Sequence, residues 1–133
     1  MRAPIVWISA IALIFVAGCE RGKPLTPPTN VTLIKITGPN MRFILRIDDE
    51  SKIAAIVKFV SEHRSGWTQP LAGVPIASYY AYFYNGDKVL GHFAVGGGFF
   101  ETDLTGDSFH SREATKSETD AFLALIGLQG VRL

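Results

Sequence analysis

The segment Ile76–Val95, with the sequence IASYYAYFYNGDKVLGHFAV, decides the fold that we predict for this chain. Asn-Gly at 85–86 is a strong signal for a two-residue hairpin, and it separates two runs rich in aromatic and aliphatic residues. A type I′ turn at this point would pair Tyr82 with Val89 and Tyr80 with Gly91. One face would then carry Ile76, Tyr80, Tyr82, Val89, Phe93 and Val95, and the other Ala77, Tyr79, Ala81, Phe83, Leu90, His92 and Ala94.

The segments on either side of this hairpin predict an α+β domain. Val31–Thr37 and Met41–Ile47 read as a second antiparallel hairpin, and Phe99–Leu104 reads as one more short strand. The acidic triplet 48–50 offers an N-cap for a first helix, because apolar residues at helical spacing follow it. Thr115-Lys-Ser-Glu is a capping box that opens a last helix. The element order is ββαβββα, which predicts an antiparallel sheet of about five strands with two helices packed on one face.

The composition fits one globular domain and excludes several classes of function. The chain has 133 residues, of which 47% are hydrophobic and 19% charged. Thirteen Lys and Arg stand against 12 Asp and Glu, so nucleic acid is not an expected partner. The single Cys excludes an intramolecular disulfide and a Cys-based metal cage. We therefore expect no metal and no cofactor.

The N-terminus has the plan of an export signal. Arg2 supplies a positive start, Ile5–Ala17 is an apolar run broken only by Ser9, and small residues follow. This run is shorter than the roughly 20 residues that a membrane-spanning helix needs. Residues 16–19, Val-Ala-Gly-Cys, resemble the lipobox of bacterial lipoprotein precursors.

That resemblance implies a processing step and a location. Cleavage would fall between Gly18 and Cys19, and the Cys19 thiol would carry a thioether-linked diacylglycerol that ties the protein to the membrane. An ordinary signal peptide is the alternative. Glu20 is not the Asp that tends to retain such lipoproteins in the inner membrane, so the periplasmic face of the outer membrane is the expected location.

Three parts of the chain follow from this interpretation. Residues 1–18 are the signal peptide, residues 19–30 are the lipidated Cys and a Pro-rich tether, and residues 31–133 form the single domain. Pro24, Pro27 and Pro28 favour an extended spacer, of about 3.1 Å per residue in a polyproline II conformation.

Few residues of the domain suggest chemistry. Gly96, Gly97 and Gly98 could form a ligand-binding loop, although a turn between strands explains them more simply. His63, His92 and His110 lack the spacing of a metal site, and the stretch from Asp103 lacks the Glu that closes a calcium loop. Thr105–Arg112 reads as a polar loop. None of these residue patterns indicates a catalytic site, and no catalytic residue is predicted.

The aromatic hairpin is the remaining candidate. Two helices can cover only one face of the sheet, so the uncovered face would expose either Tyr80, Tyr82 and Phe93 or Tyr79 and Phe83 beside His92. The predicted partner-binding residues are Tyr80, Tyr82 and Phe93. The alternative is that the tyrosines belong to the core or are covered by the loops at Trp67–Pro75 and Thr105–Arg112. We expect a lipid-anchored accessory, inhibitor or immunity-type module that binds an envelope protein. The alternative is a small-ligand-binding protein or small hydrolase that acts on envelope material, with a cleft near Gly96–Gly98 and His92 or His110.

Overall fold

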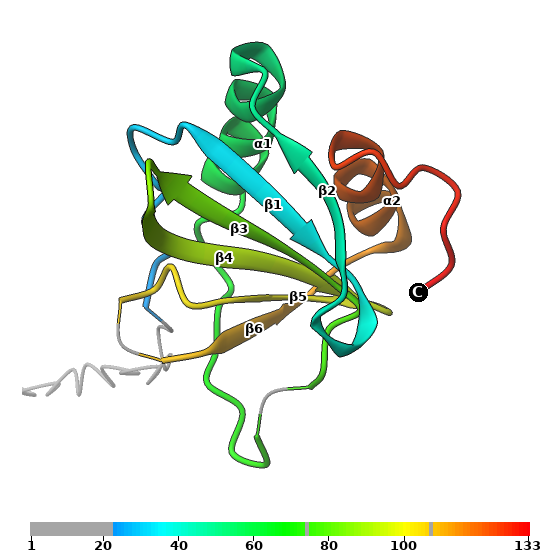
Figure 1. Ribbon diagram of the computed structural model, residues 1–133. Helices are drawn as coiled ribbons and strands as arrows, with labels where there is room; N and C mark the ends of the chain where they lie inside the picture. The colour runs from blue at the N-terminus through cyan, green and yellow to red at the C-terminus, as the bar shows by residue number, and fades with distance from the viewer. Residues whose placement is uncertain (1–22, 74, 107) are drawn as a thin grey trace, which may run out of the picture.

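The computed structural model describes residues 23–73, 75–106 and 108–133. These residues form one six-stranded antiparallel sheet in the order β2-β1-β3-β4-β5-β6 and two α-helices (Figure 1). The elements are, in chain order, β1 (Leu33–Thr37), a short 3-10 turn (Pro39–Met41), β2 (Phe43–Ile47), α1 (Glu50–Glu62), β3 (Tyr79–Asn85), β4 (Lys88–Gly96), β5 (Phe99–Thr102), β6 (His110–Glu113) and α2 (Lys116–Leu125). The predicted α+β class with an antiparallel sheet and two helices is confirmed.

The strand count differs by one from the prediction. β6 lies in what the sequence predicts to be a polar loop, and it pairs with β5 from Phe99↔Glu113 to Thr102↔His110. Its sequence, His-Ser-Arg-Glu, has no apolar alternation, so backbone pairing alone reveals it as a strand. On its other side, Ser111 exchanges two backbone hydrogen bonds of 2.9 Å with Thr68, which covers this edge of the sheet.

Both helices begin at the caps that the sequence predicts. Asp49 accepts a hydrogen bond from the Lys52 amide at 2.9 Å, and α1 starts at the next residue. Thr115 and Glu118 form a reciprocal capping box at α2, with bonds of 3.1 and 3.0 Å. The acidic triplet at 48–50 therefore contributes a helix cap, as predicted.

The core lies between the helices and one face of the sheet. Four phenylalanine rings meet there, one from α1, one from α2 and two from the sheet: Phe59, Phe122, Phe93 and Phe100. Because Phe93 contacts both Phe59 and Phe122, the two helices pack on the same face (Figure 1). Among the described residues, no helix lies on the opposite face of the sheet, which is called the helix-free face below.

The register of the central hairpin corrects the predicted faces. The pairs start at Asn85↔Lys88, and a bulge between Tyr84 and Phe83 brings Tyr82 opposite His92. Tyr82 is thus paired three residues further along β4 than the predicted partner, Val89. An odd displacement exchanges the two faces of one strand relative to the other. Tyr80 and Tyr82 consequently share a face with His92, and Phe93 points into the core, where it is fully buried.

A glycine at the bulge permits this register. Gly91 has φ +141°, a conformation that residues with a side chain rarely adopt. A Cβ at this position would lie 2.6 Å from the Leu104 side chain and 2.8 Å from Oδ1 of Asp103. Close approach of β4 to the end of β5 therefore requires glycine here.

Part of the Pro-rich segment before β1 packs on the domain, so the part that could serve as a spacer is shorter than predicted. Leu25 is fully buried in the core, and its amide donates to the Arg64 carbonyl at 2.9 Å. The next amide, of Thr26, donates to the Leu104 carbonyl at 2.9 Å. The domain therefore begins near Leu25, before the predicted boundary at residue 31, and a free spacer after Cys19 would end no later than Pro24. Cys19 and the signal sequence lie outside the described residues.

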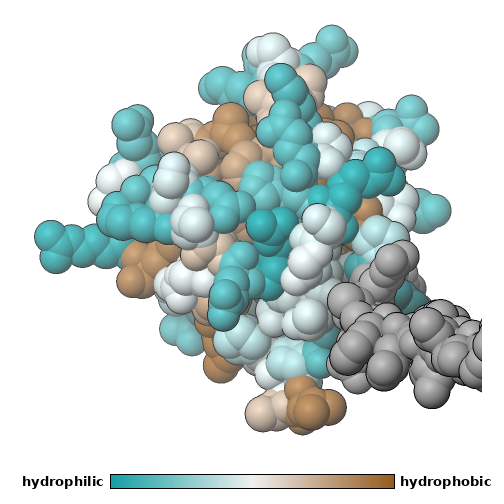
Figure 2. All heavy atoms as spheres, turned by 180° about the vertical axis from the view of Figure 1, so that it is seen from behind, coloured by the Kyte–Doolittle hydropathy of each residue, from teal (hydrophilic) through white to brown (hydrophobic). Residues whose placement is uncertain are grey.

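The surface is mostly polar with a few apolar patches. Figure 2, seen from the side opposite to Figure 1, shows apolar atoms at several places among polar ones, one of them the lower end, where the segment between α1 and β3 projects. In this segment Leu71 is fully exposed, and Ile76 is 90% exposed. The Ile76 end of the segment borders the groove described next.

Candidate functional site

A groove of about 460 Å³ lies on the helix-free face of the sheet. Its floor is formed by the neighbouring strands β3, β4 and β5. Tyr82 on β3 pairs with His92 on β4, and Ala94, also on β4, pairs with Glu101 on β5. Its rim comes from segments outside these strands. The lining residues are Met41, Pro75, Ile76, Tyr80, Tyr82, His92, Glu101, Asp103 and Phe109.

A charged cluster forms the centre of the floor. Nε2 of His92 lies 2.7 Å from Oε1 of Glu101, and Nδ1 lies 3.3 Å from Oδ2 of Asp103. The His92 backbone amide also donates to Oδ1 of Asp103 at 2.8 Å. The side chains of His92 and Glu101 are 6% and 4% exposed, whereas that of Asp103 is 40% exposed. Both ring nitrogens of a buried histidine are thus bonded to carboxylates.

This arrangement sets the protonation of the cluster. Burial by itself would lower the pKa of His92, but the hydrogen bonds and charges of Asp103 and Glu101 outweigh it and raise the pKa to about 9. Burial opposes ionisation of Asp103, but hydrogen bonds from the His92 ring and amide hold its pKa below the usual range. At neutral pH the cluster therefore contains an imidazolium between carboxylates.

Aromatic rings surround the imidazolium. The rings of Tyr80 and Tyr82 stack with centroids 6.0 Å apart, and each centroid lies 5.6 Å from that of His92. Phe109 approaches the same ring at 5.6 Å. Burial raises the pKa of both tyrosines, so the phenols are neutral at physiological pH. Three rings around a cation are a favourable electrostatic arrangement.

The rim of the groove is apolar and open to solvent. Phe109 is 53% exposed, Met41 59% and Ile76 90%. The hydroxyl of Tyr82 contacts Sδ of Met41 at 3.7 Å, which joins the rim to the floor. Exposed large apolar side chains beside a half-buried aromatic floor are typical of a surface that another molecule covers.

The sequence identified only part of this groove. Tyr80 and Tyr82, two of the predicted partner-binding residues, line the groove, whereas the third, Phe93, does not, because the bulge turns it into the core. Glu101 and Asp103 were missed. They stand nine and eleven residues after His92, and only the β4–β5 pairing brings them together.

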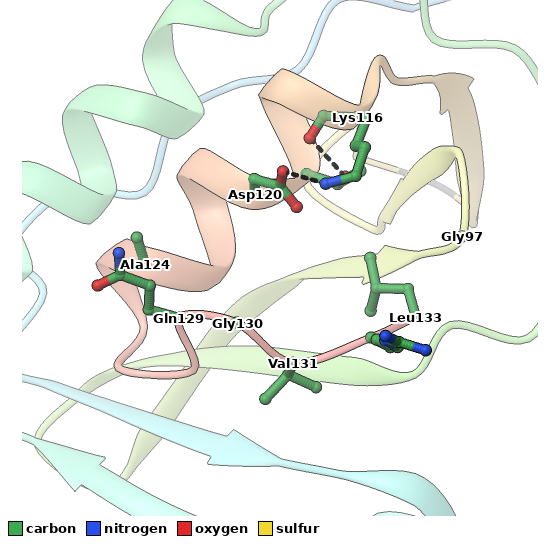
Figure 3. A pocket seen from close by; sticks show the side chains of 10 residues that line it. Gly97, Lys116, Asp120, Ala124, Gln129, Gly130, Val131 and Leu133 are labelled. Carbon is green, nitrogen blue, oxygen red and sulfur yellow. Dashed lines mark hydrogen bonds and ion pairs between the residues drawn. The ribbon is translucent and has the colours of Figure 1, made fainter.

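Gly96 is the last residue of β4, and Gly97 and Gly98 form the turn to β5. Gly98 has φ +80°, and its carbonyl accepts a hydrogen bond from Ala114 at 2.9 Å. Gly97 borders a second groove, of about 720 Å³, between α2 and the C-terminal segment (Figure 3). Two of its lining residues, Lys116 and Asp120, form an ion pair of 2.6 Å within α2. Figure 3 marks this ion pair with a dashed line.

The other two histidines make bonds within the fold. His63 is the C-cap of α1, and its Nε2 is 3.0 Å from Oε2 of Glu118 on α2. The Nδ1 of His110 lies 2.8 Å from the Thr105 hydroxyl. Neither histidine lines the groove around His92. In the described part of the chain, no three His, Cys, Asp or Glu residues are placed to hold a metal ion.

Comparisons with known proteins show no relative. No family model, curated protein or solved structure matches the chain. Within residues 23–133, apart from positions 74 and 107, no helix is long and apolar enough to cross a membrane. The function is therefore argued from the chemistry of the groove.

Proposed function

We propose that this protein is a lipid-anchored bacterial envelope protein whose domain binds a protein partner through the helix-free groove. The observation that carries the proposal is the open groove with Tyr80 and Tyr82 on its floor and Phe109, Met41 and Ile76 exposed on its rim. Aromatic residues and Met are enriched in protein interfaces because they bury a large area at little cost in conformational entropy.

The chemistry of His92 supports binding over catalysis. A general base needs a free lone pair, but both ring nitrogens of His92 are bonded to carboxylates and the pKa is about 9. The described lining of the groove holds no Ser, Thr, Cys or Lys that could act as a nucleophile. An accessory or inhibitor role fits this set of residues better than hydrolysis does.

The membrane anchor is the second part of the proposal. It rests on the lipobox-like residues 16–19, which place an acylated Cys19 at the start of the mature chain. Because the segment from Leu25 packs on the domain, the anchor would hold the domain close to the membrane surface. The periplasmic face of the outer membrane is the proposed location.

Replacement of both groove tyrosines tests the binding site. We expect the variant Tyr80→Ser/Tyr82→Ser to reduce crosslinking to its envelope partner in intact cells by at least about tenfold, since two interface aromatics together contribute more than about 1.4 kcal/mol. The measurement is affinity capture of the crosslinked, tagged protein followed by mass spectrometry.

Tyr84→Ser is the matched control for this experiment. Tyr84 lies on the same strand and the same face but outside the groove, where the Lys35 ammonium lies 4.7 Å from its ring. We expect this variant to capture the partner normally. Equal capture by all three proteins, or equal loss in both variants, would contradict the proposed site.

Cys19→Ser tests the anchor separately. Serine has no thiol to accept the diacylglycerol, so we expect an uncleaved and unacylated precursor. Intact-protein mass spectrometry of the membrane fraction measures this directly. Normal processing of the variant would remove the lipoprotein assignment and leave the groove proposal unaffected.

A further inference from the structure

We propose that the groove recognises a cationic side chain, an arginine flanked by apolar residues in an extended segment of the protein partner. This inference rests on the proposed function and names the chemistry of the partner. It follows from the charge of the groove, from one carboxylate oxygen that the fold leaves unbonded, and from the apolar rim.

The described lining of the groove is negatively charged. Glu101 and Asp103 contribute two carboxylates, His92 contributes one positive charge at neutral pH, and no Lys or Arg lines the groove. The net charge of the cluster is therefore negative. Beside the buried carboxylate of Glu101, this charge favours a cation over a neutral or anionic group.

Glu101 offers a free acceptor. Its Oε1 is bonded to His92, and no described residue donates a hydrogen bond to Oε2. Glu101 is one of the lining residues of the groove, and its Oε2 is not among the fully buried polar atoms without a partner in the described part of the chain. A carboxylate that is 4% exposed and only half bonded carries a desolvation cost that a ligand N–H group would offset.

The geometry favours arginine with apolar neighbours. A guanidinium can donate to a carboxylate and stack on an aromatic ring at the same time, and Tyr80, Tyr82 and Phe109 supply the rings. The same sheet face already holds Lys35 over Tyr84, which shows a cation on one of its tyrosines. Met41 and Ile76 on the rim would contact the residues on either side of the arginine.

Short peptides test the inference on the full chain purified in detergent. The probes are acetyl-Ala-Leu-Arg-Leu-Ala-amide and its counterparts with Gln or Glu in place of Arg. We expect the Arg peptide to bind at least about tenfold more tightly than the Gln peptide, the Glu peptide to bind least, and the difference to shrink in high salt. Isothermal titration calorimetry measures affinity, and NMR of the His92 ring reports the place of binding.

Variants of the carboxylates locate the effect. Glu101→Gln and Asp103→Asn are expected to remove the preference for the Arg peptide, and Glu113→Gln, on the same face but outside the groove, is expected to retain it. Asp103→Asn keeps an acceptor for the His92 amide, so it remains informative if Glu101→Gln proves unstable. Thermal unfolding identifies any variant that fails to fold.

The outcomes separate this inference from the proposed function. Equal binding of the Arg and Gln peptides, or no binding of either, overturns the inference. Partner capture that depends on Tyr80 and Tyr82 but is unchanged in Glu101→Gln and Asp103→Asn also overturns the inference. That result would leave the proposed function unaffected. Loss of partner capture together with loss of the Arg preference supports both.

Discussion

Phe93→Ala is expected to lower the free energy of unfolding by about 3–5 kcal/mol, the usual cost of emptying a fully buried aromatic site. The Phe93 ring lies 5.0 Å from those of Phe100 and Phe122, 5.7 Å from that of Trp67 and 6.2 Å from that of Phe59. It thus joins both helices to the centre of the sheet. Its loss leaves a cavity that four rigid rings cannot collapse to fill.

Urea-induced unfolding measures this effect, and Tyr82→Ser is the control. Tyr82 is partly exposed on the other face, so its replacement is expected to cost no more than about 1 kcal/mol. The comparison also separates the two faces functionally. If Phe93→Ala left stability unchanged and abolished partner capture, Phe93 would belong to the interface, as the sequence predicted, and the observed register would be wrong.

The stability of the domain is expected to fall as the pH rises from 6.5 to 9. The pKa of His92 is raised from 6.5 to about 9 in the folded protein, so the folded state binds a proton that the unfolded chain releases in this window. The stabilisation is fully present below pH 6.5 and is lost above the folded pKa. A shift of this size corresponds to about 3 kcal/mol at most.

Asp103, a carboxylate partner of His92, has the opposite effect on stability, because its contribution is lost at low pH. The pKa of Asp103 is lowered from 3.8, so its contribution is present above that value and is lost as the pH falls through the folded pKa. Together the two groups place the highest stability contributed by this cluster between about pH 4 and 6.5.

Two measurements check the pH prediction. Urea-induced unfolding at intervals between pH 6.5 and 9 should show a decline that His92→Gln largely removes. The NMR titration of the His92 ring should have its midpoint near pH 9. A midpoint near 6.5, with the same decline in wild type and variant, would show that the ion pairs do not hold the proton.

The sequence alone predicted what local interactions decide. The cap at Asp49 and the capping box at Thr115 and Glu118 are bonds between residues three apart, so their residue types mark the helix starts. Alternation and the turn at 85–86 located the central strands in the same way. These signals are sufficient for the α+β class, because each is complete within a few residues.

The tertiary structure decided the face on which each residue lies, and with it the groove. A single bulge beside Gly91, where the absence of a side chain leaves room for Leu104 and Asp103, sends Phe93 into the core and His92 to the opposite face. Gly91 is compatible with such a bulge, but the residue types around it do not determine where the strand pairing shifts. The Glu101–His92–Asp103 cluster and the burial of Leu25 likewise depend on backbone pairing between distant segments, which residue types alone do not encode.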